Sequence, residues 1–262
     1  RLHAALSRLS RKALLITSLI INLSILGFFK YYNFFLDSLI ESLNIFGIQL
    51  NTNSLSIILP VGISFYTFQS LSYTIDIYKG KTEPTRNLVN FFAYVSFFPQ
   101  LVAGPIERAK NLLPQFAAKR TFDYPLAVDG MRQILWGLVK KVVIADNCGL
   151  YTSGIIENYS THSGSTLALG IFLFSFQIYC DFSGYSDIAI GTAKLFGFRL
   201  KRNFNFPYFS RNINEFWRRW HISLSSWFKD YIYIPLGGGK GGHYTRIRNL
   251  FVVFLISGFW HG

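Results

Sequence analysis

His261 is the residue of this sequence that says most about possible chemistry. It lies 13 residues after Arg248, in the last apolar run of the chain, which corresponds to ~20 Å if the run is helical. The hydrocarbon core of a bilayer is about 30 Å thick, so an Arg248 at headgroup level would place His261 well inside the membrane. An ionisable side chain at that depth marks a functional site, unless neighbouring helices hold it as a neutral imidazole. The sequence leaves both interpretations open.

His221 is the second histidine of interest, and it lies in a segment, residues 216–227, that carries three tryptophans among basic residues. Tryptophan prefers the headgroup level of a membrane, which indicates an interfacial element. In this setting Arg218 and Arg219 are candidates for contact with lipid phosphates or with the anionic part of an acyl donor. An ordinary amphipathic anchor is the competing interpretation.

The remaining polar residues within apolar surroundings predict structural roles. Asp181 and Asp187 are six residues apart, which places them on different faces of a helix. We therefore expect each to pair with an arginine or a tyrosine. The glycine-rich stretch 237–242 lacks the spacing of a phosphate-binding P-loop and predicts a flexible loop.

Hydrolase and metalloenzyme functions have no support in the sequence. Neither a GxSxG nor an HExxH motif is present, and no metal site is expected. The cysteines, Cys148 and Cys180, form no metal-type cluster and predict no disulfide.

The composition is that of a membrane protein. Hydrophobic residues make up 50% and charged residues 15% of the 262 residues, whereas an average soluble domain has about 25% charged residues. The net charge is +13, but the basic residues lie between long apolar stretches. This distribution fits cytoplasmic loops under the positive-inside rule and disfavours nucleic-acid binding.

The apolar stretches predict an all-α, polytopic transmembrane helical bundle that includes re-entrant or interfacial helices. Residues 13–29 are at the short limit of a span, and residues 31–50 predict an interfacial amphipathic helix. Residues 55–77 are long enough to span but contain Pro60 and Gly62. Residues 88–106 predict either a span or a shorter helix that enters from one face.

The second half of the chain alternates apolar runs with polar stretches. Residues 111–129 are expected to form a loop, and residues 131–156 a helix that lies partly at an interface. A strongly apolar run covers residues 165–180, and the basic stretch 198–242 is expected to be cytoplasmic. Because the chain begins at Arg1 and stops just after an apolar run, we expect a single membrane domain over residues 1–262 that lacks helices at both ends.

Seven segments, taken in order, resemble the membrane-bound O-acyltransferase (MBOAT) family, in particular its bacterial branch of alginate O-acetylation proteins. The segments are PVGISFYTFQ (60–69), FFPQLVAGPI (97–106), KKVVIADN (140–147), QIYCDFSGYSD (177–187), FWRRWHISLS (216–225), DYIYIPLGG (230–238) and GFWHG (258–262).

The resemblance implies acyl transfer from a thioester, acetyl-CoA or an acyl carrier, to a hydroxyl group, without a bound cofactor. It makes His261 the central catalytic residue and His221 the second signature residue. A positioned imidazole can take the hydroxyl proton during attack, so His261 would be the base. His221 would hold the acceptor, orient His261 or stabilise developing charge. The candidate residues for binding substrate or donor are Arg218, Arg219, Trp217, Trp220, Asp181 and Gln100.

The resemblance also implies a location and partners. We expect a multi-pass protein of the bacterial plasma (inner) membrane that passes an acyl group, most simply acetyl, to an exported polysaccharide. The expected partners are the lipid bilayer, the polysaccharide and an acetyltransferase of the SGNH type or an acyl carrier protein. Arg218, Arg219 and Lys229 are expected near the cytoplasmic mouth. Two alternatives are D-alanyl transfer to teichoic acid and a non-enzymatic transporter or channel, although no inverted repeat supports the latter.

Overall fold

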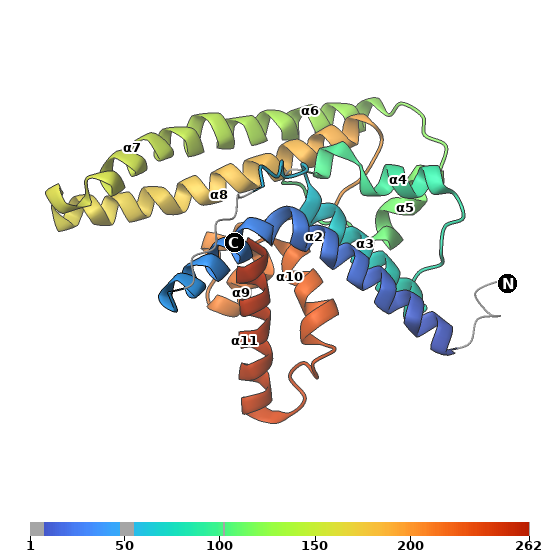
Figure 1. The fold of residues 1–262 in the computed structure, drawn as a ribbon. Helices are drawn as coiled ribbons and strands as arrows, with labels where there is room; N and C mark the ends of the chain where they lie inside the picture. The colour runs from blue at the N-terminus through green and yellow to red at the C-terminus, as the bar shows by residue number, and fades with distance from the viewer. Residues whose placement is uncertain (1–7, 48–54, 102, 262) are drawn as a thin grey trace. The chain divides into compact units, whose positions relative to one another are not determined.

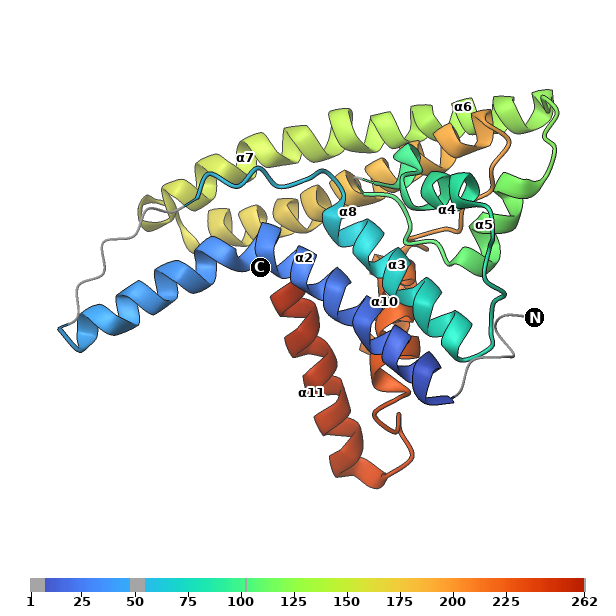
Figure 2. The same ribbon diagram turned by 45° about the vertical axis from the view of Figure 1, so that its right-hand side comes forward.

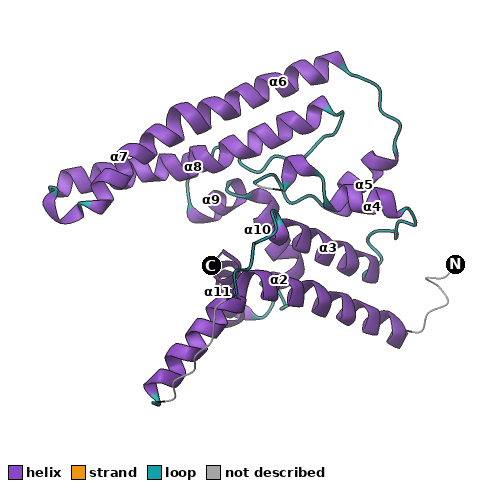
Figure 3. Ribbon diagram, turned by 45° about the horizontal axis from the view of Figure 1, so that its top comes forward, coloured by secondary structure: helices purple, strands orange, loops and turns teal. Residues whose placement is uncertain are grey.

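The computed structural model describes residues 8–47, 55–101 and 103–261, and within these ranges it contains helices and loops but no strand (Figure 3). The all-α prediction is therefore confirmed. The α-helices are α2 (Arg8–Ile45), α3 (Ile63–Tyr78), α4 (Leu88–Val95), α5 (Ala109–Ala117), α6 (Tyr124–Leu138), α7 (Asp146–Glu157), α8 (Gly164–Leu195), α9 (Ile213–Arg219), α10 (Ile222–Phe228) and α11 (Gly242–His261). The 3₁₀ turns are η1 (Phe98–Gln100), η3 (Tyr159–Thr161) and η4 (Pro207–Phe209), and the π-helical turns are η2 (Val139–Ala145) and η5 (Lys229–Tyr233).

Two of the described helices are long and apolar enough to cross a membrane: α2, over Ser10–Ile45, and α8, over Gly164–Leu195. The predicted division of the first stretch into a span and a separate interfacial helix is wrong. No proline interrupts the sequence between Arg8 and Ile45, so the backbone hydrogen bonds continue without a break.

Residues 55–77 do not form one helix long enough to span, because α3 begins only at Ile63 and has 16 residues. Pro60 lacks the N–H that a helix interior needs, and Gly62 has a left-handed φ of 77°, so the chain cannot enter the helix earlier. For residues 88–106 the shorter-helix alternative is the correct one: α4 ends at Val95, before Pro99.

The chain divides into two compact units, Arg1–Ser96 and Phe97–Gly262. In the first unit α2 and α3 lie side by side (Figure 1). The hydroxyl groups of Ser18 and Thr74 join these helices at 3.1 Å, and Arg11 donates to the carbonyl oxygen of Tyr78 at 3.3 Å.

The second unit is built on a long antiparallel pair, in which α6, η2 and α7 run back along α8 (Figure 2). Glycines set the distance between these helices. An added Cβ on Gly130 would lie 2.7 Å from the carbonyl oxygen of Gly191, and one on Gly137 would lie 2.6 Å from that of Gly184. Because the same clashes occur in the reverse direction, the two backbones touch at two points seven residues apart.

Charged side chains cross the same helix pair. Lys140 forms an ion pair with Asp187 and donates to the Ser183 hydroxyl at 3.1 Å. Gln133 donates to the second Asp187 oxygen at 2.9 Å, and Lys194 donates to Gln133 at 2.7 Å. A buried charge needs such a partner, and the helix-face reasoning correctly separated Asp187 from Asp181.

The predicted loop over residues 111–129 is wrong in most of its length. Residues Ala109–Ala117 form α5, which buries Leu112 and Leu113 while Pro114 faces outward. Helix α6 then begins at Tyr124, where the side chain of Asp123 accepts from the Leu126 N–H at 3.0 Å. Pro125 lies in the first turn of α6, where its missing N–H costs nothing.

Candidate active site

His221 occupies the corner between α9 and α10 and is 5% exposed. Its φ of 42° is in the left-handed region, which is unfavourable for a residue with a side chain. Among the described residues only His221 and Phe206 combine a side chain with a positive φ. Such outliers persist only where surrounding contacts impose them, and they cluster at functional sites.

Aromatic rings form the walls around the imidazole. The Phe182 ring meets it edge to face at a centroid distance of 4.6 Å, and the Phe204 ring lies roughly parallel to it at 6.4 Å. The buried Nε2 atom of His221 has no hydrogen-bond partner among the described residues. A buried nitrogen without a partner is rare in folded proteins, so this atom has the capacity for one further hydrogen bond.

Burial lowers the pKa of His221 from 6.5 to about 3, and the electrostatic effect of His261 is the second, smaller cause. The imidazole is therefore neutral at physiological pH. His261 is the last described residue of α11, its side chain is exposed, and its ring lies 4.5 Å from that of Trp260. The charge of His261 thus reaches His221, although the two histidines lie 40 residues apart in the sequence.

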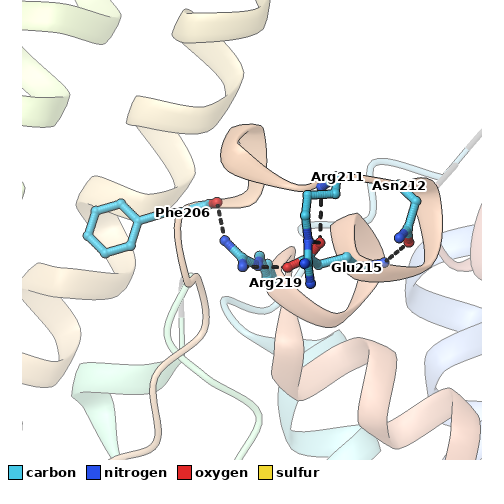
Figure 4. A network of polar contacts seen from close by, with 5 residues as sticks. All are labelled: Phe206, Arg211, Asn212, Glu215 and Arg219. Atoms are coloured by element: carbon cyan, nitrogen blue, oxygen red, sulfur yellow. Dashed lines mark hydrogen bonds and ion pairs between the residues drawn. The ribbon is translucent and has the colours of Figure 1, made fainter.

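Arg219 is held in a network beside this corner (Figure 4). Its guanidinium donates to Glu215 at 2.5 Å and to the carbonyl oxygen of Phe206 at 3.4 Å. Arg211 contacts the other Glu215 oxygen at 3.1 Å, and Asn212 accepts from the Glu215 N–H at 2.9 Å. Hydrogen bonds from the backbone N–H of Arg211 and then from its side chain lower the pKa of Glu215 to about 2, and the charge of Arg219 makes a smaller contribution. Arg219 therefore stabilises the corner, while Arg218 is exposed on the same helix.

The two tryptophans of the FWRRWHISLS segment (216–225) have different surroundings. Trp220 stacks on Phe216 at a centroid distance of 5.6 Å and faces Tyr179 of α8 at 6.2 Å. Trp217 is 41% exposed and meets Phe254 of α11 at 5.6 Å. Trp220 therefore packs the corner against α8, whereas Trp217 connects it to the helix that carries His261.

Asp181 and Gln100 lie on other elements. The Asp181 carboxylate is 2.7 Å from Lys141, which also contacts Asp146 at 2.7 Å. The expectation of an arginine or tyrosine partner for Asp181 and Asp187 is wrong, because consecutive lysines, 140 and 141, supply the charge to both. Gln100 is 1% exposed in η1.

The glycine-rich stretch is anchored rather than a plain flexible loop. Asn249, fully buried on α11, donates to the carbonyl oxygens of Leu236 at 3.1 Å and Gly238 at 2.9 Å. Positive φ angles at Gly237 and Gly238, 103° and 59°, shape the turn. In the described ranges no group of three or more His, Cys, Asp or Glu side chains is placed to hold a metal ion.

Asn203 is a residue of the site that the sequence analysis did not identify. It is fully buried and hydrogen-bonds to both residues that follow His221. The only signal in the sequence is an asparagine among aromatic residues, Phe204 and Phe206, and that signal does not distinguish a buried amide from an exposed one.

Comparison with known proteins gives a consistent result. The model of the membrane-bound O-acyltransferase family matches residues 85–262. A probable alginate O-acetylase of Pseudomonas aeruginosa is 47% identical over 95% of this chain and 47% of its own length. A peptidoglycan O-acetyltransferase of Helicobacter pylori is 38% identical over 100% of this chain and 54% of its own length. A teichoic acid D-alanyltransferase of Bacillus subtilis is 28% identical over 77% of this chain and 53% of its own length. The chain thus spans about half the length of these relatives.

Proposed function

Because the chain belongs to the membrane-bound O-acyltransferase family, we propose that it carries the catalytic histidines of an enzyme that transfers acetyl groups to hydroxyls of an exported polysaccharide. The observation that carries this proposal is the corner between α9 and α10, where His221 is 5% exposed, has a left-handed φ of 42° and has a buried Nε2 without a hydrogen-bond partner among the described residues. O-acetyl transfer is preferred to D-alanyl transfer because the O-acetylating relatives are 47% and 38% identical, against 28% for the D-alanyltransferase.

The environments of the two histidines support different roles. A general base works best when its pKa is near the operating pH. His221, with a pKa of about 3, is too weakly basic for that role, but its unpartnered Nε2 can hydrogen-bond the acceptor or the thioester carbonyl. His261 is exposed at the end of α11 and is the better candidate to take the proton from the attacking hydroxyl.

In the proposed reaction the hydroxyl oxygen attacks the thioester carbonyl while the proton passes to His261. The C–S bond then breaks, and the thiolate leaves with a proton, so that the products are an O-acetyl ester and a free thiol. The donor is cytoplasmic acetyl-CoA or an acyl carrier protein. The acetyl group reaches the polysaccharide directly or through a partner acetyltransferase of the SGNH type.

The proposed location is the bacterial plasma membrane, with the basic segment around Arg218 and Lys229 at the cytoplasmic mouth. The two apolar helices, α2 and α8, support this location. Positive residues favour the cytoplasmic side, where the thioester donor is made.

The test replaces His261 by alanine in the complete gene and measures acetate that mild alkali releases from the cell-surface polysaccharide. We expect the acetate to fall by about 10²–10⁴-fold, the usual contribution of a general base. His243→Ala is the matched control because His243 is an exposed histidine at the other end of the same helix. Both variants must reach the membrane amount of the wild type.

Two outcomes would contradict the proposal. Acetate at the wild-type level in His261→Ala would show that this histidine is not the base. Release of D-alanine in place of acetate from wild-type cells would assign the protein to D-alanyl transfer.

A further inference from the structure

We propose that Asn203 is a positioning residue that caps helix α10 from outside and thereby leaves the His221 imidazole free for the substrate. This role rests on the proposed function, because Asn203 sets the orientation of one of the two histidines that the proposed reaction uses. It rests on hydrogen bonds, burial and backbone geometry.

His221 stands at the N-cap position of α10, where a side chain normally accepts a hydrogen bond from the first turn. The imidazole makes no such bond. A helix start that is buried without a cap leaves N–H groups unsatisfied, which is costly. Another group must therefore perform the capping.

Asn203 supplies both missing acceptors. Its backbone carbonyl oxygen accepts from the Ile222 N–H at 2.8 Å, and its side-chain Oδ1 accepts from the Ser223 N–H at 3.2 Å. The Oδ1 also accepts from the Ser223 hydroxyl at 2.9 Å. Asn203, which lies 18 residues before His221 in the sequence, thus caps the N–H groups of the first two residues of α10.

The loop that contains Asn203 holds the corner from the other side as well. The Asn205 N–H donates to the carbonyl oxygen of Arg219 at 2.9 Å, and Arg219 donates to the carbonyl oxygen of Phe206. His221 is therefore bracketed by hydrogen bonds before and after it. This bracket accounts for the positive φ of both His221 and Phe206, since neither conformation is stable without external support.

Asn203 is itself fixed by buried contacts. Its Nδ2 donates to the Ser186 hydroxyl of α8 at 3.2 Å, and Ser186 donates to the carbonyl oxygen of Ala103 at 3.0 Å. The Ser223 hydroxyl in turn accepts from the Ile106 N–H at 3.0 Å. Helices α8 and α10 therefore meet at the Asn203 amide, and Ala103 and Ile106 bond the serines on either side of it. A buried hydrogen-bond network of this kind favours a single geometry.

The test measures how well His221 is protected, independently of catalysis. Full-length protein in detergent is treated with diethyl pyrocarbonate, and modification of His221 is quantified by mass spectrometry against that of exposed His243. In Asn203→Ala we expect the ratio to rise by roughly 2- to 30-fold, the range that corresponds to loss of one helix cap. Asn203→Asp keeps the Oδ1 acceptor and should stay closer to the wild type. Asn158→Ala, an exposed asparagine of the α7 end, should not change the ratio.

Polysaccharide acetate is measured in the same variants. If the ratio rises and the acetate falls in Asn203→Ala alone, both proposals hold. If the modification ratio rises in Asn203→Ala but the wild-type protein forms no acetyl ester, the proposed function is refuted and the positioning role of Asn203 stands. An unchanged ratio in Asn203→Ala overturns the positioning role. Should this variant fail to accumulate, Ser186→Ala removes the hydroxyl that fixes the Asn203 amide; it must raise the ratio above that of the wild type, and an unchanged ratio there overturns the inference.

Discussion

The contact between Gly137 of α6 and Gly184 of α8 gives the prediction with the most direct structural basis. A methyl group on Gly137 would lie 2.6 Å from the Gly184 carbonyl oxygen and 2.8 Å from a side-chain carbon of Ile188. The nearest obstacle is backbone, so no side-chain rotation can relieve the clash. The helices must separate by about 0.4–0.8 Å, the difference between 2.6 Å and the 3.0–3.4 Å of the tightest real contacts.

The matched control for Gly137→Ala is Gly154→Ala. Gly154 lies in α7 and has no atom within 4 Å of an added Cβ. Alanine favours the helix by ~0.5–1 kcal/mol in both variants, so this gain cancels in the comparison. What remains is the cost of overpacking, typically ~1–3 kcal/mol. Gly137→Ala should therefore be less stable than Gly154→Ala by that amount.

The assay is the loss of the monodisperse peak in detergent after heating, which avoids the assumption of reversible unfolding. A difference of 1 kcal/mol corresponds to roughly 2–4 °C for a chain of 150–250 residues. We expect Gly137→Ala to lose its peak several degrees below Gly154→Ala. If it survives to the same temperature or higher, the two backbones are not in contact and the antiparallel pairing described for α6 and α8 is wrong.

Two further predictions concern buried charge. Asp187→Ala leaves the Lys140 ammonium, whose side chain is 9% exposed, without its counterion and should lower the free energy of unfolding by ~3–5 kcal/mol. The double variant Lys140→Met with Asp187→Leu should recover most of that loss. Equal heat resistance of the single and double variants would contradict this. Because the pKa of His221 is lowered to about 3 in the folded protein and is about 6.5 when unfolded, the unfolded state binds more protons between these values, and stability should fall as the pH drops from 6.5 towards 3, by at most ~1.4 kcal/mol per pH unit. His221→Gln should flatten this slope in thermal scans across the range, and an unchanged slope would show that His221 is not the group responsible.

The sequence alone was sufficient for the helical class and for the apolar character of α2 and α8, while the choice of His221 and His261 stays a prediction. These depend on composition, on the length of apolar runs and on local motifs, which are properties of neighbouring residues. Helix α6 could have been placed more accurately, since the Asp123 cap and Pro125 are visible signals of a helix start. The loop predicted over residues 111–129 failed because prolines were given more weight than the apolar pair at 112 and 113.

Tertiary structure decided which polar groups have partners. Lys140 and Lys141, not an arginine or a tyrosine, neutralise the two aspartates because the glycines let α6 and α8 approach closely enough for lysine side chains to reach. Asn203 became part of the site only because the chain folds back to place its amide at the start of α10. The burial of His221, and hence its neutral imidazole, likewise results from contacts with Phe182 and Phe204, which lie 39 and 17 residues before it. Local patterns encode helices and chemical types, whereas burial and hydrogen-bond partners depend on contacts between distant segments, which exist only in the folded chain.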